Sequence, residues 1–249
     1  MKLYYIFHSG FVIIEDRTAV IIDFYEDSID EFHGIIHDVL IHNFSKIYVL
    51  SSHFHSDHFN KYIFSWKLQR PDIVYILSRD ILRHKRVKND EAIFLMKGEE
   101  YDDGFLKVKA YGSTDAGDSF LIILHGVKFF HAGDLNNWHW ADESTLQEIK
   151  KAEGDYFAEL KYITNDIQSV DVTMFPVDRR IGTDYFRGAK QFLERINVRI
   201  FIPMHFTYDY EGGNAFQEEA EKYGSIFIPI KKKGQEINIT DLLELNKEL

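Results

Sequence analysis

The sequence predicts a mixed α/β fold in which two mixed sheets pack together with helices outside them. Short β-rich runs open the chain and return in its middle, and strand-like and helix-like segments alternate in its last third. No linker rich in proline, glycine or serine and no internal repeat interrupts the 249 residues. We therefore expect one domain over residues 1–249.

The first half of the chain predicts a strand-rich start. LYYIF, FVIIE and AVIID are typical of a meander of strands, and the segment 27–43 is typical of a helix, with Ser28 and Glu31 in a capping-box pattern. KIYVLSS predicts a buried strand. A helix is expected over 61–69 and a strand over 71–78.

The second half continues with a short basic helix within 79–90 and with strand-like runs. SFLIIL and VKFFHAG, joined by HG, predict a β-hairpin. A helix over 142–166 is expected to be weakened at Gly154. VDVTMFPV and VRIFIPMHF predict strands, helices are expected over 183–197 and 214–224, and SIFIPI and QEINI close the chain.

The composition limits the chemistry and the partners. The chain has no cysteine, so any metal must be bound by nitrogen and oxygen atoms. The net charge of −11 argues against nucleic-acid binding, which needs a basic face. The amino terminus lacks the apolar region of a signal peptide, and no apolar run approaches the ~18 residues of a membrane span. We expect a cytoplasmic protein with a small-molecule substrate and no membrane partner.

The stretch SSHFHSDHFN carries the clearest chemical signal. Imidazoles bind borderline transition metals, and a carboxylate adds a harder, charged ligand. His53 and His55 are two positions apart, so on extended chain both rings lie on one side. Asp57 and His58 follow after a turn and can face a second point. One segment can therefore provide ligands for two metal ions.

Two further ligand candidates end predicted strands. Asp134 ends VKFFHAGD, and His205 ends RIFIPMH. A rigid sheet holds side chains at such positions while the loops accept substrate. We expect both residues to join the metal site.

These motifs resemble those of the metallo-β-lactamase superfamily. VIIDFY with Asp23, HFHSDH, HAGDL and IPMHF stand in the family's order and cover nearly the whole chain. HSGF near the start also looks like the branch of ascorbate-6-phosphate lactonase-like hydrolases. The resemblance implies a four-layer αββα sandwich with a metal centre at one edge of the two sheets.

The resemblance also implies a role for each ligand. Two ions would be bound, with His53 and His55 on the first and Asp57, His58 and His205 on the second. Asp134 would bridge both ions, and Asp23 would orient ligands by hydrogen bonding.

One family ligand is replaced in this chain. The family usually supplies a third histidine to the first ion through an H-x-x-G pattern. Here AYGSTDAGDSF places Thr114, a poor ligand, three positions before Gly117. Asp115 or Ser113 are alternatives. We expect the second ion, whose ligand set is complete, to bind more tightly than the first.

Three further polar positions each allow two interpretations. His8 either lines the site or caps the first hairpin. His139, in the NNWHW segment that follows the predicted hairpin, either faces the substrate or packs with Trp138 and Trp140. The VDRRIG segment with Asp178 either binds an anionic substrate or is a solvated loop.

The pattern as a whole predicts a metal-dependent hydrolase. One or two ions, Zn²⁺ first and Mn²⁺ or Fe as alternatives, would activate water for attack on an ester, lactone, amide or phosphodiester. Asp57 would also orient or deprotonate the water. The alternatives are a nuclease of the tRNA 3′-processing type and a non-catalytic metal-binding protein of the same fold. The sequence leaves the substrate and the oligomeric state open.

Overall fold

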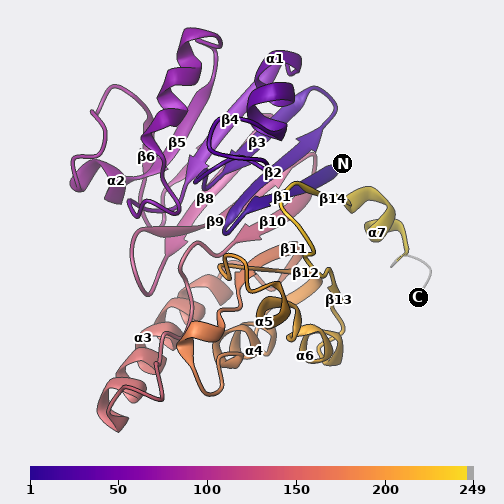
Figure 1. The fold of residues 1–249 in the computed structure, drawn as a ribbon. Coiled ribbons are helices and arrows are strands. Elements are labelled where there is room, and N and C mark those ends of the chain that lie inside the picture. Colours follow the sequence, from indigo (N-terminus) through magenta and orange to yellow (C-terminus); the bar gives the residue numbers. More distant parts are fainter. Residues whose placement is uncertain (246–249) are drawn as a thin grey trace. The chain divides into compact units, whose positions relative to one another are not determined.

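A computed structural model describes residues 1–245 of the protein. The chain divides into two compact units, one formed by Met1–Leu95 with the carboxy-terminal segment from Lys231, and the other by Met96–Ile230. Each unit contains one seven-stranded sheet (Figure 1). Among the described residues, no helix has the length and apolar character needed to cross a membrane. The expectation of a single domain stays a prediction.

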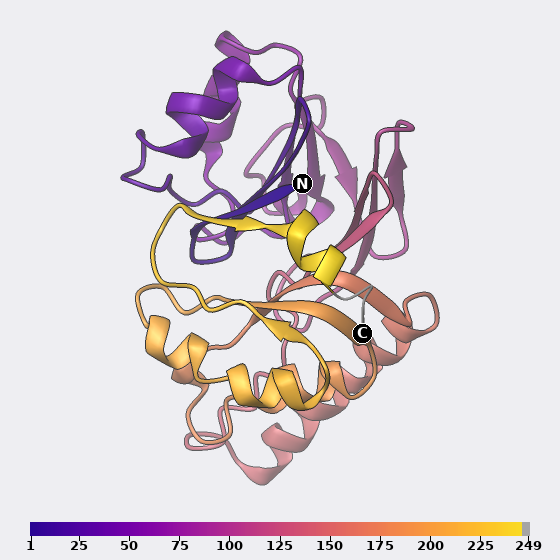
Figure 2. The same cartoon turned by 90° about the vertical axis from the view of Figure 1, so that its right-hand side faces the viewer.

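The sheet of the first unit is mixed. Its strand order is β14-β1-β2-β3-β4-β5-β6. The strands are β1 (Lys2–Phe7), β2 (Gly10–Glu15), β3 (Thr18–Ile22), β4 (Lys46–Ser51), β5 (Val74–Ser78), β6 (Ile93–Leu95) and β14 (Gln235–Asn238). Pairs from β14 to β3 are antiparallel, and pairs from β3 to β6 are parallel. The predicted amino-terminal meander is confirmed, and Figure 2 shows β14 beside β1.

Short helical segments accompany this sheet. They are a π-helical turn (Ile35–Leu40), α1 (Ile41–Asn43), a 3-10 helix (Lys61–Leu68), α2 (Arg79–Arg83) and α7 (Ile239–Leu245). Phe24 and Trp66 meet edge to face at 5.0 Å and pack with Val49 of β4 in the apolar core. Aromatic pairs of this geometry add to the burial of apolar surface. The core therefore fixes the carboxyl ends of β3 and β4.

The helix predicted over 27–43 begins only at Ile35, and its predicted capping box is wrong. The buried carboxylate of Asp27 accepts the backbone N–H groups of Ile36 at 3.0 Å and His37 at 2.9 Å. The Asp27 side chain, which lies before the loop that leads into the helix, therefore accepts hydrogen bonds from backbone N–H groups of the first helical turn. The capping-box pattern considers only a spacing of three residues, so it could not detect this contact.

The sheet of the second unit is also mixed. Its order is β13-β12-β11-β10-β9-β8-β7. The strands are β7 (Glu100–Asp102), β8 (Leu106–Gly112), β9 (Asp118–Leu124), β10 (Val127–His131), β11 (Ser169–Pro176), β12 (Asn197–Met204) and β13 (Ile226–Phe227). Pairs from β7 to β10 are antiparallel, and pairs from β10 to β13 are parallel. The predicted hairpin is confirmed by the pairing of β9 with β10.

The helices of the second unit follow its strands in sequence. They are α3 (Leu146–Thr164), a 3-10 turn (Arg179–Ile181), α4 (Arg187–Leu193), α5 (Tyr210–Asn214) and α6 (Gln217–Lys222). Thr145 and Glu148 form a capping box at the start of α3. Gly154 does not interrupt α3, and its position is open to solvent. The long packed helix thus tolerates the low helix propensity of one glycine.

The parallel strands of each unit bring candidate site residues to one sheet edge, because parallel neighbours end on the same side. In the first unit, Asp23 follows β3 and His53 lies just beyond β4. In the second unit, Asp178 follows β11 and His205 follows β12. Two mixed sheets with helices confirm the predicted mixed α/β class.

Candidate metal centre

Five polar residues gather in the first unit, and we call them the amino-terminal cluster: His8, His53, His55, Asp57 and His58. His8 lies between β1 and β2, and the others lie in the loop after β4. His8, His53 and His58 are buried, whereas Asp57 keeps 39% of its side chain exposed. The cluster thus has buried nitrogen atoms and a carboxylate that reaches solvent.

A buried aspartate orients His58. Asp23 accepts hydrogen bonds from the backbone N–H of Ser52 at 2.7 Å, from the Ser52 hydroxyl at 2.6 Å and from His58 Nδ1 at 2.7 Å. This bond leaves Nε2 of His58 on the side of Asp57, whose Oδ2 lies 3.9 Å away. A carboxylate that holds one ring nitrogen is the arrangement that orients histidine ligands in metal sites. The contact matches the role expected of Asp23.

His8 and Asp57 form a second contact in the cluster. His8 Nε2 lies 3.2 Å from Asp57 Oδ2. His8, Asp57 and His58 each offer a ligand atom, and these atoms lie within 4.8 Å of one another. Burial raises the pKa of Asp57, but the hydrogen bond with His8 and the charge of His58 outweigh it and hold the pKa well below its usual range. Asp57 is therefore ionised, as a metal ligand must be.

His53 and His55 face each other across a short distance. His53 Nε2 and His55 Nδ1 are 3.0 Å apart, and the two rings meet nearly at right angles. Two nitrogens bound to one tetrahedral zinc ion at ~2.0–2.1 Å stand roughly 3.3 Å apart. The pair therefore fits a shared ion after a small adjustment, and the ring contact matches the one-sided placement predicted for the two residues.

The second unit contains a smaller group, the carboxy-terminal cluster of Asp134 and His205. Asp134 Oδ1 lies 3.2 Å from His205 Nε2, and both side chains are buried. Asp178 Oδ2 lies 2.9 Å from His205 Nδ1. Asp178 thus orients His205 as Asp23 orients His58, so both histidines turn Nε2 toward a second carboxylate.

Sequence reasoning missed this role of Asp178. Arg180 is bound to the same carboxylate at 2.5 Å. Burial raises the pKa of Asp178, but the bonds from His205 and Arg180 outweigh it and lower the pKa to about 2. The contact depends on the pairing of Pro176 with Met204, a register that no pattern in the sequence gives. Residues just beyond two paired parallel strands lie side by side.

Backbone conformation marks three residues of these sites. His8, Asp23 and His205 have φ values of 56°, 47° and 69°. Residues other than glycine rarely adopt this left-handed region, and such strain is concentrated at functional sites. The surrounding structure thus holds the candidate ligand His205, the orienting residue Asp23 and His8 beside Asp57 in less favourable conformations.

Thr114 has a structural contact in place of a ligand role. Its hydroxyl donates to the backbone carbonyl of Asn136 at 2.6 Å and accepts the backbone N–H of Asn136 at 3.0 Å. These bonds fix the loop that follows Asp134. Asp115 is exposed and offers an oxygen within 4.8 Å of a ligand atom of Asp134. Asp115 therefore remains a candidate for the position that Thr114 leaves open.

His139 is buried and holds a loop. Its Nδ1 accepts the backbone N–H of Ala141 at 3.1 Å, and its Nε2 lies 3.2 Å from the backbone carbonyl of Asp184. Burial lowers the pKa of this imidazole. Because both ring nitrogens have backbone partners, the structure favours the packing interpretation of His139 over a substrate contact.

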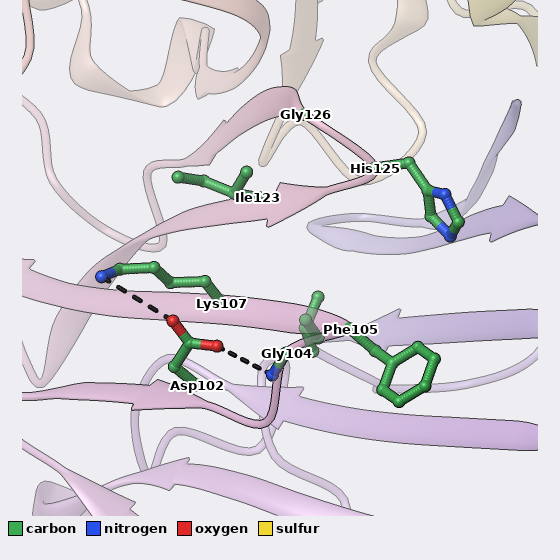
Figure 3. A pocket seen from close by; sticks show the side chains of 8 residues that line it. Asp102, Gly104, Phe105, Lys107, Ile123, His125 and Gly126 are labelled. Carbon is green, nitrogen blue, oxygen red and sulfur yellow. Dashed lines mark hydrogen bonds and ion pairs between the residues drawn. The ribbon is translucent and has the colours of Figure 1, made fainter.

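The second unit also contains a pocket. It has a volume of about 260 Å³ and is lined by residues of the β7–β8 and β9–β10 turns and their strands, including Phe105 and His125 (Figure 3). Asp102 there accepts the backbone N–H of Gly104 at 2.9 Å. None of the candidate ligands lines this pocket, so its volume does not identify it as the site of metal chemistry.

The chain is similar to several known proteins, although no family model matches it. It is 25% identical to a UPF0173 metal-dependent hydrolase of Nanoarchaeum equitans, over 96% of this chain and 100% of the relative. A novel metallo hydrolase of Ignicoccus hospitalis, Igni18, superimposes with a TM-score of 0.65 at 18% identity, over 95% of this chain and 97% of Igni18.

A second solved structure identifies the fold. The metallo-β-lactamase fold protein YhfI of Bacillus subtilis matches with a TM-score of 0.61 at 11% identity, over 95% of this chain and 99% of YhfI. At such identity the match concerns the fold alone. With the motifs in HFHSDH, HAGDL and IPMHF, it confirms the resemblance predicted from the sequence: the chain is a protein of the metallo-β-lactamase fold and a relative of metal-dependent hydrolases.

Proposed function

We propose that this protein is a metal-dependent hydrolase that uses activated water on an ester, lactone, amide or phosphodiester of a small molecule. The repeated arrangement at His58 and His205 is the main support. In each case a buried aspartate holds Nδ1, at 2.7 Å and 2.9 Å, and Nε2 is turned toward another carboxylate. Oriented imidazoles beside ionised carboxylates are a donor set for a divalent ion.

The proposed ligands come from both clusters, and their joint role rests on the order of the family's motifs. They are His53, His55, Asp57, His58, Asp134 and His205. All donors are nitrogen or oxygen, which suits Zn²⁺ and also admits Mn²⁺ or Fe. Asp134 would supply carboxylate oxygen to the ions. The ion with Asp57, His58 and His205 should bind more tightly, because the hydroxyl of Thr114 is committed to the backbone of Asn136.

The roles of the residues follow from their contacts. A divalent ion at such a site acidifies a water molecule and polarises the substrate oxygen. Asp57 is ionised and exposed at 39%, so it can bind an ion and accept a hydrogen bond from water at once. Asp57 could then orient the water or accept its proton. His8, whose Nε2 lies 3.2 Å from Asp57 Oδ2, holds this carboxylate in place.

Replacing Asp57 with alanine tests this function. Its side chain ends in a loop beyond β4, so Asp57→Ala should fold normally. Loss of a ligand and of general-base or orienting help should lower kcat/KM by roughly 10²–10⁴. The assay is a panel of esters, lactones, amides and phosphodiesters with zinc content measured in each preparation. Asp72→Ala, at an exposed aspartate paired with Arg70, is the matched control.

Two results would contradict the proposal. One is full activity of Asp57→Ala at full metal loading, which would remove Asp57 from the mechanism. The other is a wild-type protein that binds metal yet hydrolyses no member of the panel, which would favour the non-catalytic metal-binding alternative.

A further inference from the structure

A basic segment follows α2 in the first unit, and the proposed function does not use it. The segment covers residues 83–88, with the sequence RHKRVK, and has four positive charges and no carboxylate. Its four cations are exposed, and they are Arg83, Lys85, Arg86 and Lys88. The whole chain has a net charge of −11. Positive charge is therefore concentrated at one place on an acidic protein.

Ion pairs do not neutralise these cations. Among the residues that the structure describes, none of the four side chains is paired with a carboxylate. The acids on either side of the segment have other contacts. Asp80 accepts the backbone N–H of Phe54 at 3.2 Å, and Glu91 accepts the backbone N–H of Lys88 at 2.6 Å. Neighbouring cations without partners repel one another and attract a multiply charged anion.

The turn at Lys85 has a backbone conformation that glycine usually occupies. Lys85 has a φ of 56°. Its backbone N–H donates to the carbonyl of Leu82 at 2.9 Å, and that of Arg86 donates to the carbonyl of Ile81 at 3.1 Å. These two bonds form a Schellman motif, in which the left-handed residue is usually glycine because a side chain costs free energy there. A lysine stabilises this turn less than a glycine would, which points to a use for its charge.

Stacking fixes the basic segment against the loop after β4. The rings of His84 and Phe54 have centroids 3.7 Å apart and planes 13° apart. Phe54 stands between the proposed ligands His53 and His55 in the sequence. Asp80 supports the contact, because its Oδ1 lies 3.1 Å from His84 Nδ1. The cations on both sides of His84 are therefore next to a residue that touches the proposed metal-binding loop.

We propose that the basic segment binds a small, multiply charged anion with phosphate or carboxylate groups. Guanidinium groups bind such oxygens in a fork, and lysines add point charges. A single carboxylate would leave most of the four cations without a partner, so the ligand should have at least two negative charges. That this anion belongs to the substrate rests on the proposed hydrolase function. Its binding rests on the first unit alone and can be tested without metal and without turnover.

Titration calorimetry of the metal-free full chain with inorganic pyrophosphate tests the binding. The double variant Lys85→Glu with Arg86→Glu reverses two charges of the basic segment. Lys231→Glu with Lys232→Glu is the matched control, because it reverses two exposed lysines of the same unit and changes the net charge equally. The first variant should bind pyrophosphate more weakly by roughly tenfold or more, and the control should lose less than about twofold. Equal losses in the two variants would overturn the proposal.

The tricarboxylate tricarballylate, titrated in the same way, separates the two sources of charge. Binding of both anions would show that charge suffices, and binding of only one would identify its group as the ligand. A wild-type protein that binds neither anion would overturn the proposal.

Lys85→Gly separates binding from folding. Glycine suits the φ of 56°, so this variant should unfold at the same urea concentration as the wild type or at a higher one. It should nevertheless bind pyrophosphate more weakly, by roughly twofold or more, because one cation is lost. Unchanged pyrophosphate binding would also overturn the proposal.

A second measurement links the basic segment to the substrate. In the zinc-loaded protein, Lys85→Glu with Arg86→Glu should lower kcat/KM for the monomethyl ester of tricarballylate roughly tenfold and leave that for methyl acetate unchanged. Added salt should reduce the difference. Equal effects on both esters would overturn the role in substrate binding. If pyrophosphate binds as expected but no ester is hydrolysed, the hydrolase proposal fails while the anion site stands.

Discussion

Replacing Asp23 with alanine removes a carboxylate that connects the core of the first unit to the proposed metal-binding loop after β4. Three donors lose their partner: the backbone N–H of Ser52, the hydroxyl of Ser52 and Nδ1 of His58, at 2.7, 2.6 and 2.7 Å. All three groups are buried. A buried donor left without a partner costs about 1–3 kcal/mol.

The expected loss of stability is about 3–5 kcal/mol, the lower part of the sum for three donors. The Ser52 hydroxyl can turn toward His53 Nδ1, which lies 3.0 Å away, and so recovers part of the cost. Asp23→Asn should lose less, since the amide oxygen still accepts one of the three bonds. Urea unfolding of the metal-free protein measures both changes.

Asp30→Ala is the matched control, because Asp30 also pairs with a histidine of the first unit. That pair, with His33 at 2.9 Å, and the bonds that Asp30 accepts from the backbone N–H groups of Phe32 and His33 are all exposed to water. Asp30→Ala should therefore shift the unfolding midpoint much less than Asp23→Ala. If Asp23→Ala and Asp30→Ala unfold at the same urea concentration, the argument from buried donors is wrong. Zinc affinity, measured by competition with a chelator, should also fall roughly 10–100-fold in Asp23→Ala.

Two further predictions concern stability. Burial raises the pKa of Asp27, but its bonds to His37 and the backbone outweigh this and lower the pKa below 3.8. The ionised form therefore stabilises the fold above that pH, and the wild type should lose this stability as the pH falls below about 4. In Asp27→Asn the unfolding free energy should fall less over the same pH range. Urea titrations at several pH values measure both. Thr114→Val should lower the free energy of unfolding by about 1–3 kcal/mol, because it leaves the backbone N–H of Asn136 without its acceptor. Thr164→Val, which removes a surface hydroxyl, is the control and should change the unfolding free energy little in the same assay.

The sequence predicted the features that depend on local pattern. Alternating apolar residues indicated the amino-terminal meander and the β9–β10 hairpin, and both are confirmed. The clustering of His53, His55 and His58 after a buried strand placed these residues in one loop. Strand ends also located Asp134 and His205, since a parallel sheet aligns the ends of its strands.

Features that depend on contacts between distant segments were not predictable. Asp27 bonds the backbone of a helix that begins eight residues later, and β14 joins β1 across nearly the whole sequence. The contact of Asp178 with His205 spans 27 positions and depends on the register of two strands. A sequence pattern gives the spacing of residues along the chain, whereas these contacts depend on which distant segments meet in the fold and on the register of the strands.

The location of bound zinc tests the central claim most directly. Crystals of protein loaded with one equivalent of zinc should give one anomalous peak at the zinc edge, within ~2.0–2.2 Å of nitrogen or oxygen ligands from Asp57, His58, Asp134 and His205. Excess zinc should add a second peak at His53 and His55. A protein that retains no zinc, or an anomalous peak away from these six residues, would contradict the account.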